Sequence, residues 1–308
     1  MKLVHLSLAL AAVAAPAFSQ SFTGRWDLTI QTAKERYPSW MEVDGNGGVR
    51  VVGRVASVHP AKEAKLEGSH LSFTTEEWFG KTIPVTWEFQ VVGKKLNGTQ
   101  KRSDGVTGRI MGLPAPTLDR PMPADWGSPV PLFNRKDLGG WETLVTEAGK
   151  SPVNHWKAIS GELVNEAAGA NIRTKQTFQD FRLHVEYNCP DDGNSGVYLR
   201  GRYETQVEYE KPGMNDKFHG MGAIYGFLAP SSELPRKPGE WETYDITLVG
   251  RRVTVVRDGV TTIDNQEIPG ITGGALNSNE GEPGPIYIQG DHTGGMKYRN
   301  ITIALPKH

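Results

Sequence analysis

Cysteine is nearly missing from this chain, which has 308 residues and a single cysteine, Cys189. One cysteine cannot form an internal disulfide, so the fold has to be stabilised by burial and hydrogen bonding instead. Cys189 stands between Asn188 and Pro190 at the end of a predicted strand. At that position we expect a buried thiol rather than a reactive nucleophile.

Three other absences narrow the class of protein. After residue 19, no apolar stretch is long enough to cross a bilayer as a helix, so we expect no permanent membrane span. The charges nearly cancel, with 34 Lys and Arg residues against 35 Asp and Glu residues, and this balance argues against nucleic acid as a partner. A Gly-x-Ser-x-Gly motif is also missing, which disfavours a serine hydrolase with a nucleophile elbow.

The N-terminal 19 residues have the three parts of a secretory signal peptide. Lys2 supplies the positive charge, residues 3–15 are almost continuously apolar, and Ala17 and Ser19 are the small residues that signal peptidase requires. We therefore expect residues 1–19 to be removed by cleavage before Gln20. The mature protein is expected to be exported to the periplasm or secreted.

Glycine and proline are abundant, with 36 and 20 residues, and helical periodicity is scarce. Short alternating runs between turn residues predict many short strands. The ~290 residues left after cleavage suffice for two domains. We predict an all-β protein with a small barrel-like domain at 20–112, a proline-rich linker at 113–129 and a two-sheet sandwich at 130–308.

The first domain has the pattern of a meander of antiparallel strands. Its opening strand carries Gly24-Arg25-Trp26, a Gly-x-Trp motif similar to that of lipocalin-type barrels. We expect closure into a barrel, because closure removes exposed strand edges. No catalytic group stands out here, and its four tryptophans are expected to pack in the core and at the rim. The predicted strands are 22–30, 39–43, 49–58, 65–67, 70–76, 82–91, 95–101 and 106–109, and the tryptophans are Trp26, Trp40, Trp78 and Trp87.

The most informative stretch is 197–209, in which apolar and polar residues alternate with a period of two. We expect a tight turn at Gly201-Arg202 to divide it into a hairpin. The odd positions should face a core, and the even positions should face solvent or the floor of a site for a polar ligand. These even positions are Tyr198, Arg200, Arg202, Glu204, Gln206 and Glu208.

Six short motifs follow one another through the second domain, at 132–141, 194–201, 203–207, 222–226, 238–241 and 298–301. In this order they resemble the 3-keto-disaccharide hydrolase domain family. The resemblance implies a concanavalin-like jelly roll and an exported enzyme that cleaves 3-keto-glycosides. It also implies a functional partner, an oxidoreductase that first oxidises the glycoside to the 3-keto sugar.

Such a substrate requires a base for the C2 proton, donors for an enolate oxygen, and a donor for the leaving group. Glu204, His219 and His292 are the alternative bases, and Arg200 is the candidate for polarising the ketone. Further polar residues on the same face or at strand ends are expected to bind the sugar. They are Asn194, Tyr198, Arg202, Gln206, Glu208, Tyr225, Gln289 and Asp291.

Three alternatives remain open from the sequence. A divalent metal bound by Asp, Glu and His side chains would be an additional cofactor, although their spacing follows no metal motif. A non-catalytic carbohydrate-binding module would use the same polar face without chemistry. A conventional glycosidase would use two carboxylates, Glu204 with Glu208 or with Asp291.

Overall fold

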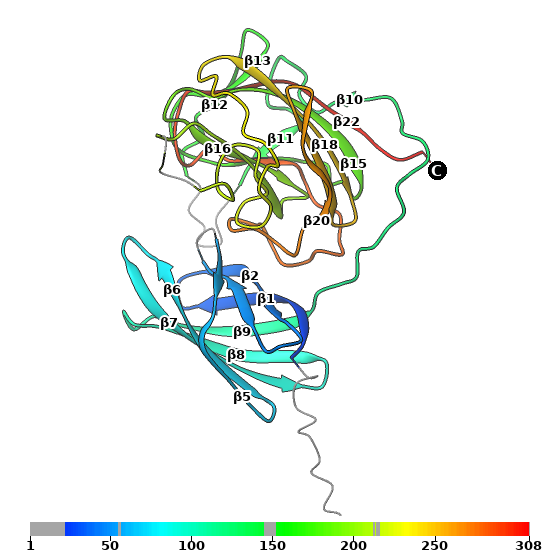
Figure 1. Cartoon of the computed structure of the whole chain (residues 1–308). Helices are drawn as coiled ribbons and strands as arrows, with labels where there is room; N and C mark the ends of the chain where they lie inside the picture. The colour runs from blue at the N-terminus through cyan, green and yellow to red at the C-terminus, as the bar shows by residue number, and fades with distance from the viewer. Residues whose placement is uncertain (1–21, 55–56, 145–151, 212, 214–215, 308) are drawn as a thin grey trace, which may run out of the picture.

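A computed structural model describes residues 22–54, 57–144, 152–211, 213 and 216–307. The predicted signal peptide lies outside these residues. Figure 1 shows two β-rich bodies connected by an extended segment, with a curled sheet below and a sandwich above. Within the described part of the chain, no helix is long and apolar enough to span a membrane.

The first body is one antiparallel sheet of nine strands that curls almost into a barrel (Figure 1). Its strand order is β4-β3-β2-β1-β9-β8-β7-β6-β5, and the curl brings β4 beside β6. The nearly closed barrel expected from the sequence is therefore present. The strands are β1 (Gly24–Thr32), β2 (Arg36–Val43), β3 (Val49–Val52), β4 (Val58–Pro60), β5 (Lys62–Glu67), β6 (His70–Trp78), β7 (Thr82–Val92), β8 (Lys95–Arg102) and β9 (Thr107–Pro114).

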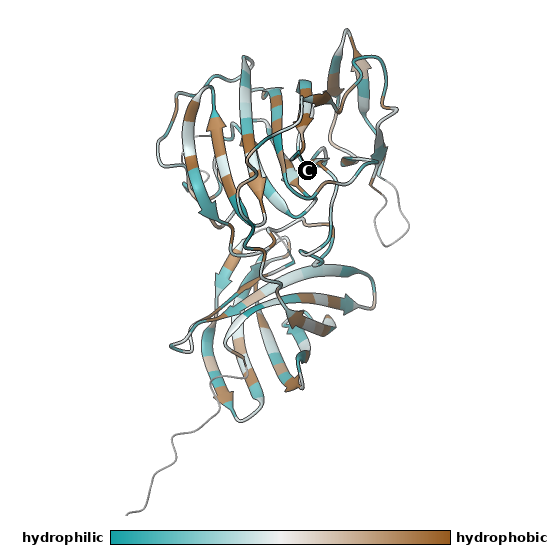
Figure 2. Ribbon diagram, turned by 90° about the vertical axis from the view of Figure 1, so that its right-hand side faces the viewer, coloured by the Kyte–Doolittle hydropathy of each residue, from teal (hydrophilic) through white to brown (hydrophobic). Residues whose placement is uncertain are grey.

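Alternation along the strands builds the core of this body. In β7, residues such as Val85 and Trp87 are buried while their neighbours are exposed. Figure 2 shows that hydrophobic and hydrophilic residues alternate along strands of this sheet. The rings of Phe73 and Trp87 stack with centroids 5.9 Å apart. Of the four tryptophans expected to pack, Trp78 is the exception, because 58% of it is exposed.

One strand prediction in this body is wrong. The stretch 49–58 was expected to be a single strand, but β3 ends at Val52 and β4 begins at Val58. Gly53 follows β3 directly, and a Cβ built there would lie 2.3 Å from Glu77 Oε2. The chain therefore leaves the sheet where a buried carboxylate on β6 occupies the space of a side chain.

The second body is a sandwich of two antiparallel sheets, as predicted. The larger sheet has the order β12-β13-β22-β15-β18-β19-β20, with β10 also paired to β22, and the smaller has the order β11-β14-β21-β16-β17. The strands are β10 (Val130–Pro131), β11 (Trp141–Thr143), β12 (Trp156–Ile159), β13 (Glu162–Asn165), β14 (Ile172–Thr174), β15 (Phe181–Asn188), β16 (Asn194–Leu199), β17 (Tyr203–Glu208), β18 (Trp241–Val249), β19 (Arg252–Arg257), β20 (Val260–Glu267), β21 (Tyr287–Ile288) and β22 (Met296–Ala304).

The apolar core of the sandwich lies between these two sheets. Val197 and Val207 of the smaller sheet belong to the same buried cluster as Leu183 and Ile246 of the larger sheet. Cys189 is part of this cluster, and its thiol is buried as expected. The odd-numbered residues of β16 and β17 thus face the core, which leaves the even-numbered residues on the opposite face of the smaller sheet.

The two bodies share apolar contacts. Trp40 and Val52 of the first body are buried in the core cluster of the second. The ring of Trp40 meets the edge of Phe227 at a centroid distance of 5.4 Å. A Cβ at Gly270 would lie only 2.2 Å from Trp40 Nε1, so glycine is required for this close approach. The first body is therefore packed firmly against the sandwich.

A pair of buried carboxyl groups crosses the same interface. Asp27 of β1 lies near enough to Glu280 of the second body for the two carboxyl groups to interact, and 9% of Asp27 is exposed. Glu280 Oε1 also accepts a hydrogen bond from the Tyr203 hydroxyl at 2.6 Å and lies 3.5 Å from Arg251 Nε. Burial, followed by the nearby Glu280, raises the pKa of Asp27 to about 9. At neutral pH the pair of carboxyl groups formed by Asp27 and Glu280 therefore holds a proton.

We predict that Asp27→Asn stabilises the protein at alkaline pH. The ordinary pKa of Asp27 is 3.8 and its folded pKa is about 9, so the wild-type protein loses stability as pH rises between these values. Asparagine has no such proton to lose. Thermal unfolding should give the wild type and the variant equal Tm values at pH 4. At pH 8 the free energy of unfolding of the variant should exceed that of the wild type by about 1–3 kcal/mol, the range for a buried polar group. Asp264→Asn, at an exposed position, is the control; a gain that does not grow with pH would contradict the prediction.

Candidate functional site

The β16–β17 hairpin brings the predicted polar residues onto one face. Tyr198 pairs with Glu204, Gly196 with Gln206, and Asn194 with Glu208, and the side chains of directly opposed residues lie on the same side of a sheet. The expected split of the 197–209 stretch into a hairpin is present. Strand alternation then gives this face a row of polar side chains along β17.

Arg200 and Arg202 do not share this face, and the prediction that they do is wrong. Arg200 and Gly201 have φ angles of 52° and 64°, and two successive positive φ angles are the signature of a type I′ turn. The left-handed turn rotates both arginines out of the strand alternation. Arg200 Nη2 donates to the Gly250 carbonyl at 2.6 Å, and Arg202 Nη1 donates to the Glu282 carbonyl at 2.8 Å. Both side chains are buried near the first body.

Glu204 is a buried carboxyl group in the polar row. It is 4% exposed, and the Tyr198 hydroxyl donates to its Oε2 at 2.8 Å. A Cβ at Gly196 would lie 2.1 Å from Glu204 Oε1, so only glycine fits opposite the carboxyl group. Burial raises the pKa of Glu204 to about 8, which makes the protonated acid the main form at neutral pH.

Neighbouring side chains fix the Glu204 carboxyl group in place. The Gln206 amide, with its nitrogen toward β16, donates to Glu204 Oε1 at 3.3 Å and to the Ser195 carbonyl at 3.1 Å. The ring of Tyr198 stacks on the ring of Tyr287 from β21, with centroids 4.1 Å apart. These contacts hold a neutral carboxylic acid on the polar face.

His292 lies beside this acid on the loop after β21. Its Nδ1 is 2.8 Å from Asp291 Oδ1, and Asn171 Nδ2 donates to Asp291 Oδ2 at 3.2 Å. The hydrogen bond to Asp291 raises the pKa of His292, and Glu204 is near enough to contribute to the same shift. When Nδ1–H donates to Asp291, Nε2 is left as the basic nitrogen. The His292 side chain is 49% exposed, so a ligand can reach it.

Two glutamates close the far end of the polar row. Asn194 Nδ2 donates to Glu210 Oε1 at 2.5 Å, and Glu210 is near enough to His292 to raise its pKa. Glu208 Oε2 accepts the backbone N–H of Glu210 at 2.6 Å. Burial raises the pKa of the Tyr225 hydroxyl, and Glu204, Glu210 and Glu208 add to the shift. Tyr225 therefore belongs to the same group of side chains.

His219 has a different environment from His292. Its Nδ1 is 2.7 Å from Asp216 Oδ1, and its Nε2 is 2.9 Å from the hydroxyl oxygen of Ser57 in the first body. The ring of His219 meets Tyr225 edge to face at a centroid distance of 4.7 Å. Both ring nitrogens thus have partners away from Glu204, and the first body contacts the margin of the site.

Gln289 completes the group of predicted residues on this face. It follows β21, and its backbone N–H donates to the Gly196 carbonyl at 3.0 Å. The structure brings together most of the residues expected from the sequence, apart from the two arginines, with His219 at the edge. These residues are Asn194, Tyr198, Glu204, Gln206, Glu208, Tyr225, Gln289, Asp291 and His292. Among the described residues, no three His, Cys, Asp or Glu side chains are arranged to hold a metal ion.

Four residues of the site were missed by sequence reasoning. Tyr287 stands between Ile286 and Ile288, and this alternation was a usable signal for a strand face. Asn171 precedes β14 and orients Asp291, and Glu210 follows the polar row by one residue. Ser57 carries no signal, because only the packing of the first body brings it to His219.

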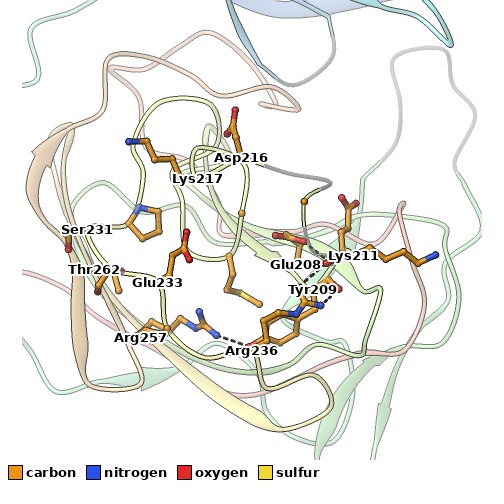
Figure 3. A pocket seen from close by; sticks show the side chains of 17 residues that line it. Glu208, Tyr209, Lys211, Asp216, Lys217, Ser231, Glu233, Arg236, Arg257 and Thr262 are labelled. Carbon is orange, nitrogen blue, oxygen red and sulfur yellow. Dashed lines mark hydrogen bonds between the residues drawn. The ribbon is translucent and has the colours of Figure 1, made fainter.

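A cavity of about 450 Å³ adjoins this face at the end of β17 (Figure 3). Its walls come from residues 208–211, 213, 216–217, 220–221, 230–234 and 236, with Arg257 and Thr262 from the larger sheet. Its charged side chains are the cations Lys211, Lys217, Arg236 and Arg257 and the acids Glu208, Glu210, Asp216 and Glu233. Glu208 and Glu210 therefore belong both to the polar face and to this cavity.

The comparisons with known proteins concern mainly the second body. Residues 128–304, more than half of the chain, match the family described as the 3-keto-alpha-glucoside-1,2-lyase-like domain. A Parabacteroides distasonis structure, inferred to be a glycosyl hydrolase, is 29% identical, with 60% of this chain and 92% of that chain covered and a TM-score of 0.47. A second such structure from the same organism is 18% identical, with 56% and 91% covered and a TM-score of 0.45.

A carbohydrate-binding module, CBM66 from Bacillus subtilis, is 14% identical, with 53% of this chain and 93% of the module covered and a TM-score of 0.32. The comparison with curated proteins found no match. The chain thus spans nearly the full length of these structural relatives, and its first body lies outside the matched family domain.

Proposed function

Because this chain belongs to the 3-keto-alpha-glucoside-1,2-lyase-like domain family, we propose that it cleaves 3-keto-glycosides by elimination followed by hydration. The observation that supports this most strongly is a protonated, buried carboxyl group beside an oriented histidine on one polar face. Two groups whose environments set different protonation states are typical of an acid and base pair.

The chemistry follows from the ketone at C3. The ketone acidifies the C2 proton, a base removes it, and the resulting enolate expels the substituent at C1. Water then adds to the enone double bond, so that the net reaction is hydrolysis. This route needs a base, donors for the enolate oxygen and a proton for the leaving group.

We assign the base to His292 rather than to His219 or Glu204. Asp291 accepts the Nδ1 proton of His292, which leaves Nε2 free to take a proton from C2. The Nε2 of His219 is hydrogen-bonded to Ser57 instead. Glu204 already holds a proton at neutral pH because burial raises its pKa to about 8.

Glu204 then acts as a neutral donor to the oxygen at C3. A buried carboxylic acid that stays protonated can donate a hydrogen bond to a developing enolate. This assignment gives Glu204 the part that the sequence analysis gave to Arg200, which hydrogen-bonds Gly250 instead. Asn194, whose amide donates one N–H to Glu210, has a second N–H as a further donor on the same face.

The geometry gives less support to a conventional carboxylate pair. Glu204 and Glu208 are four residues apart in one strand, which separates their backbones by about 13 Å. Inverting glycosidases use a separation of roughly 6.5–9.5 Å, and retaining ones use less. Asp291 is engaged by His292 and Asn171. The proposed reaction therefore proceeds through C2 rather than by direct displacement at C1.

Deuterium labelling tests the proposal. Reaction of a 3-keto-α-glucoside in deuterated water should release the leaving group and place deuterium at C2 of the product, read by mass spectrometry or NMR. An enzyme-free control measures background exchange beside the ketone. Release without deuterium at C2 would favour direct displacement, and binding without release would favour a carbohydrate-binding module.

We also propose that the enzyme acts outside the cytoplasm. The signal peptide predicted at 1–19 would export the protein, so the glycoside would be cleaved there. The substrate class requires a separate oxidation of the sugar at C3, so an oxidoreductase has to act before this enzyme.

A further inference from the structure

We propose that Tyr225 donates the proton to the leaving group and that Ser57 of the first body, acting through His219, holds Tyr225 in position. The inference rests on the proposed function, because elimination at C1 produces an oxygen that needs a proton. His292 takes the C2 proton and Glu204 donates to the enolate oxygen. Neither group serves the departing oxygen.

The strand register places Tyr225 beside Glu204 on the polar face. Thr205 of β17 bridges Ile224 in antiparallel fashion, so residues 222–228 run along the outer edge of β17. The backbone N–H of Tyr225 donates to the Glu204 carbonyl at 3.1 Å. Thr205 and Ile224 are buried toward the core, so their neighbours Glu204 and Tyr225 face the opposite way. The Cβ atoms of residues opposed in this manner lie about 4.5–5.5 Å apart.

The Tyr225 hydroxyl is available to a ligand. The residue is partly exposed, and no side chain in the described part of the chain forms a hydrogen bond with its hydroxyl group. Burial, followed by the nearby Glu204, raises the pKa of Tyr225, so the hydroxyl holds its proton at neutral pH. A departing alkoxide is a strong base and can take this proton.

The first body fixes the other side of Tyr225. The Ser57 hydroxyl oxygen lies 2.9 Å from His219 Nε2, and the ring of His219 meets the ring of Tyr225 at a centroid distance of 4.7 Å. The next residue, Gly226, has a φ angle of 74°, and a Cβ built there would lie 3.3 Å from Ser57 Oγ. Tyr225 is therefore held between Glu204 on β17 and a histidine that the first body orients.

The transfer completes the elimination without another reactant. The C3 carbonyl re-forms, and the electron pair of the C2–C3 double bond moves to form the C1–C2 double bond. The C1–O bond breaks with its electrons on the glycosidic oxygen, which takes the Tyr225 proton. Proton exchange with water then restores Tyr225 and His292. His292 follows β21 and Tyr225 lies beyond β17, so the base and the donor come from opposite sides of the β16–β17 hairpin.

Two substrates that differ only in the leaving group test the role of Tyr225. The methoxide of methyl 3-keto-α-glucoside needs a proton to depart, whereas the 4-nitrophenolate of the 4-nitrophenyl analogue is a weak base that departs without one. Tyr225→Phe should lower kcat for the methyl glycoside by about 10²–10⁴-fold, the usual contribution of a general acid. It should leave kcat for the nitrophenyl glycoside nearly unchanged. A residue that only supports the fold would lower both.

Deuterium exchange locates the step that the variant impairs. In deuterated water, Tyr225→Phe should still place deuterium at C2 of unreacted methyl glycoside, because the base is intact and only departure of the leaving group is slow. An enzyme-free sample corrects for background exchange beside the ketone. If the variant places no deuterium there, the C2 step itself is damaged and the assignment to the leaving group is overturned.

Ser57→Ala tests the contribution of the first body. It should reproduce the pattern of Tyr225→Phe on a smaller scale, with kcat for the methyl glycoside lowered about 3–10-fold, the effect of one lost hydrogen bond. Ser69→Ala, at an exposed turn of the same body, is the matched control. Full activity of Ser57→Ala on the methyl glycoside would overturn the positioning role.

The outcomes separate this inference from the proposed function. If Tyr225→Phe affects the two substrates equally, or affects neither, Tyr225 is not the donor to the leaving group. In that case release of both leaving groups by the wild type leaves the proposed function standing. If the wild-type protein releases neither leaving group, the proposed function itself is overturned.

Discussion

Glu204→Ala is expected to lower kcat on a 3-keto-α-glucoside by about 10²–10³-fold, the loss that follows removal of one oxyanion donor. The buried carboxyl group is the donor that the proposed mechanism places at the enolate oxygen. Glu204→Gln keeps a hydrogen-bond donor of the same shape, so we expect it to retain more activity than the alanine variant. Steady-state kinetics on both variants measures the difference.

The pH profile separates this function from a purely structural one. Glu204 must be protonated to donate, and burial raises its pKa to about 8. Wild-type kcat/KM should therefore fall as pH rises through about 8, and the glutamine variant should lack this descending limb. Glu142→Gln, at an exposed position on β11, is the control. An unchanged descending limb in Glu204→Gln would contradict the assignment.

His292→Ala is expected to lower kcat by about 10²–10⁴-fold, the usual contribution of a general base. Asp291→Asn should act differently, because Asp291 raises the pKa of His292 through their hydrogen bond. Removing the negative charge lowers that pKa, so the ascending limb of the pH profile should move to lower pH. The profile of kcat/KM against pH for both variants checks these two effects.

Comparison with His219 decides between the two histidines. His219→Ala removes the contacts with Ser57 and Asp216 but no group that reaches Glu204. We expect a smaller loss than in His292→Ala. His70→Ala, at an exposed position of β6, is the control for the loss of a surface histidine. A larger loss in His219→Ala than in His292→Ala would reverse the assignment of the base.

Sequence periodicity predicted the part of the site that depends on one strand. The spacing of Glu204, Gln206 and Glu208 is sufficient to predict that their side chains lie on one face of the sheet, because alternate residues of a strand share a face. The same rule failed at Arg200, where two positive φ angles in the turn rotate the side chain away. Periodicity identifies a face only as far as the strand continues.

Contacts between segments that are distant in the chain could not be predicted from the sequence. Nothing near Asp27 indicates that its carboxyl group meets Glu280, and nothing near Ser57 indicates that it reaches His219. These pairs depend on how the barrel packs against the sandwich. The all-β architecture was predictable, since turn residues and alternating runs recur along the whole chain, whereas the packing between the two bodies was not.

The burial of Trp40 in the sandwich core bears on how the protein unfolds and how it can be divided. The matched family region begins at residue 128, but the apolar core of the sandwich includes Trp40 and Val52 of the barrel. Cutting the chain at 128 would leave the edge of Phe227 and the backbone at Gly270 facing water in place of an indole ring. Relatives that consist of the sandwich alone would need another side chain to cover that position. Substitutions at Trp40 and Gly270 are therefore expected to be coupled during evolution, although the two residues lie on different bodies.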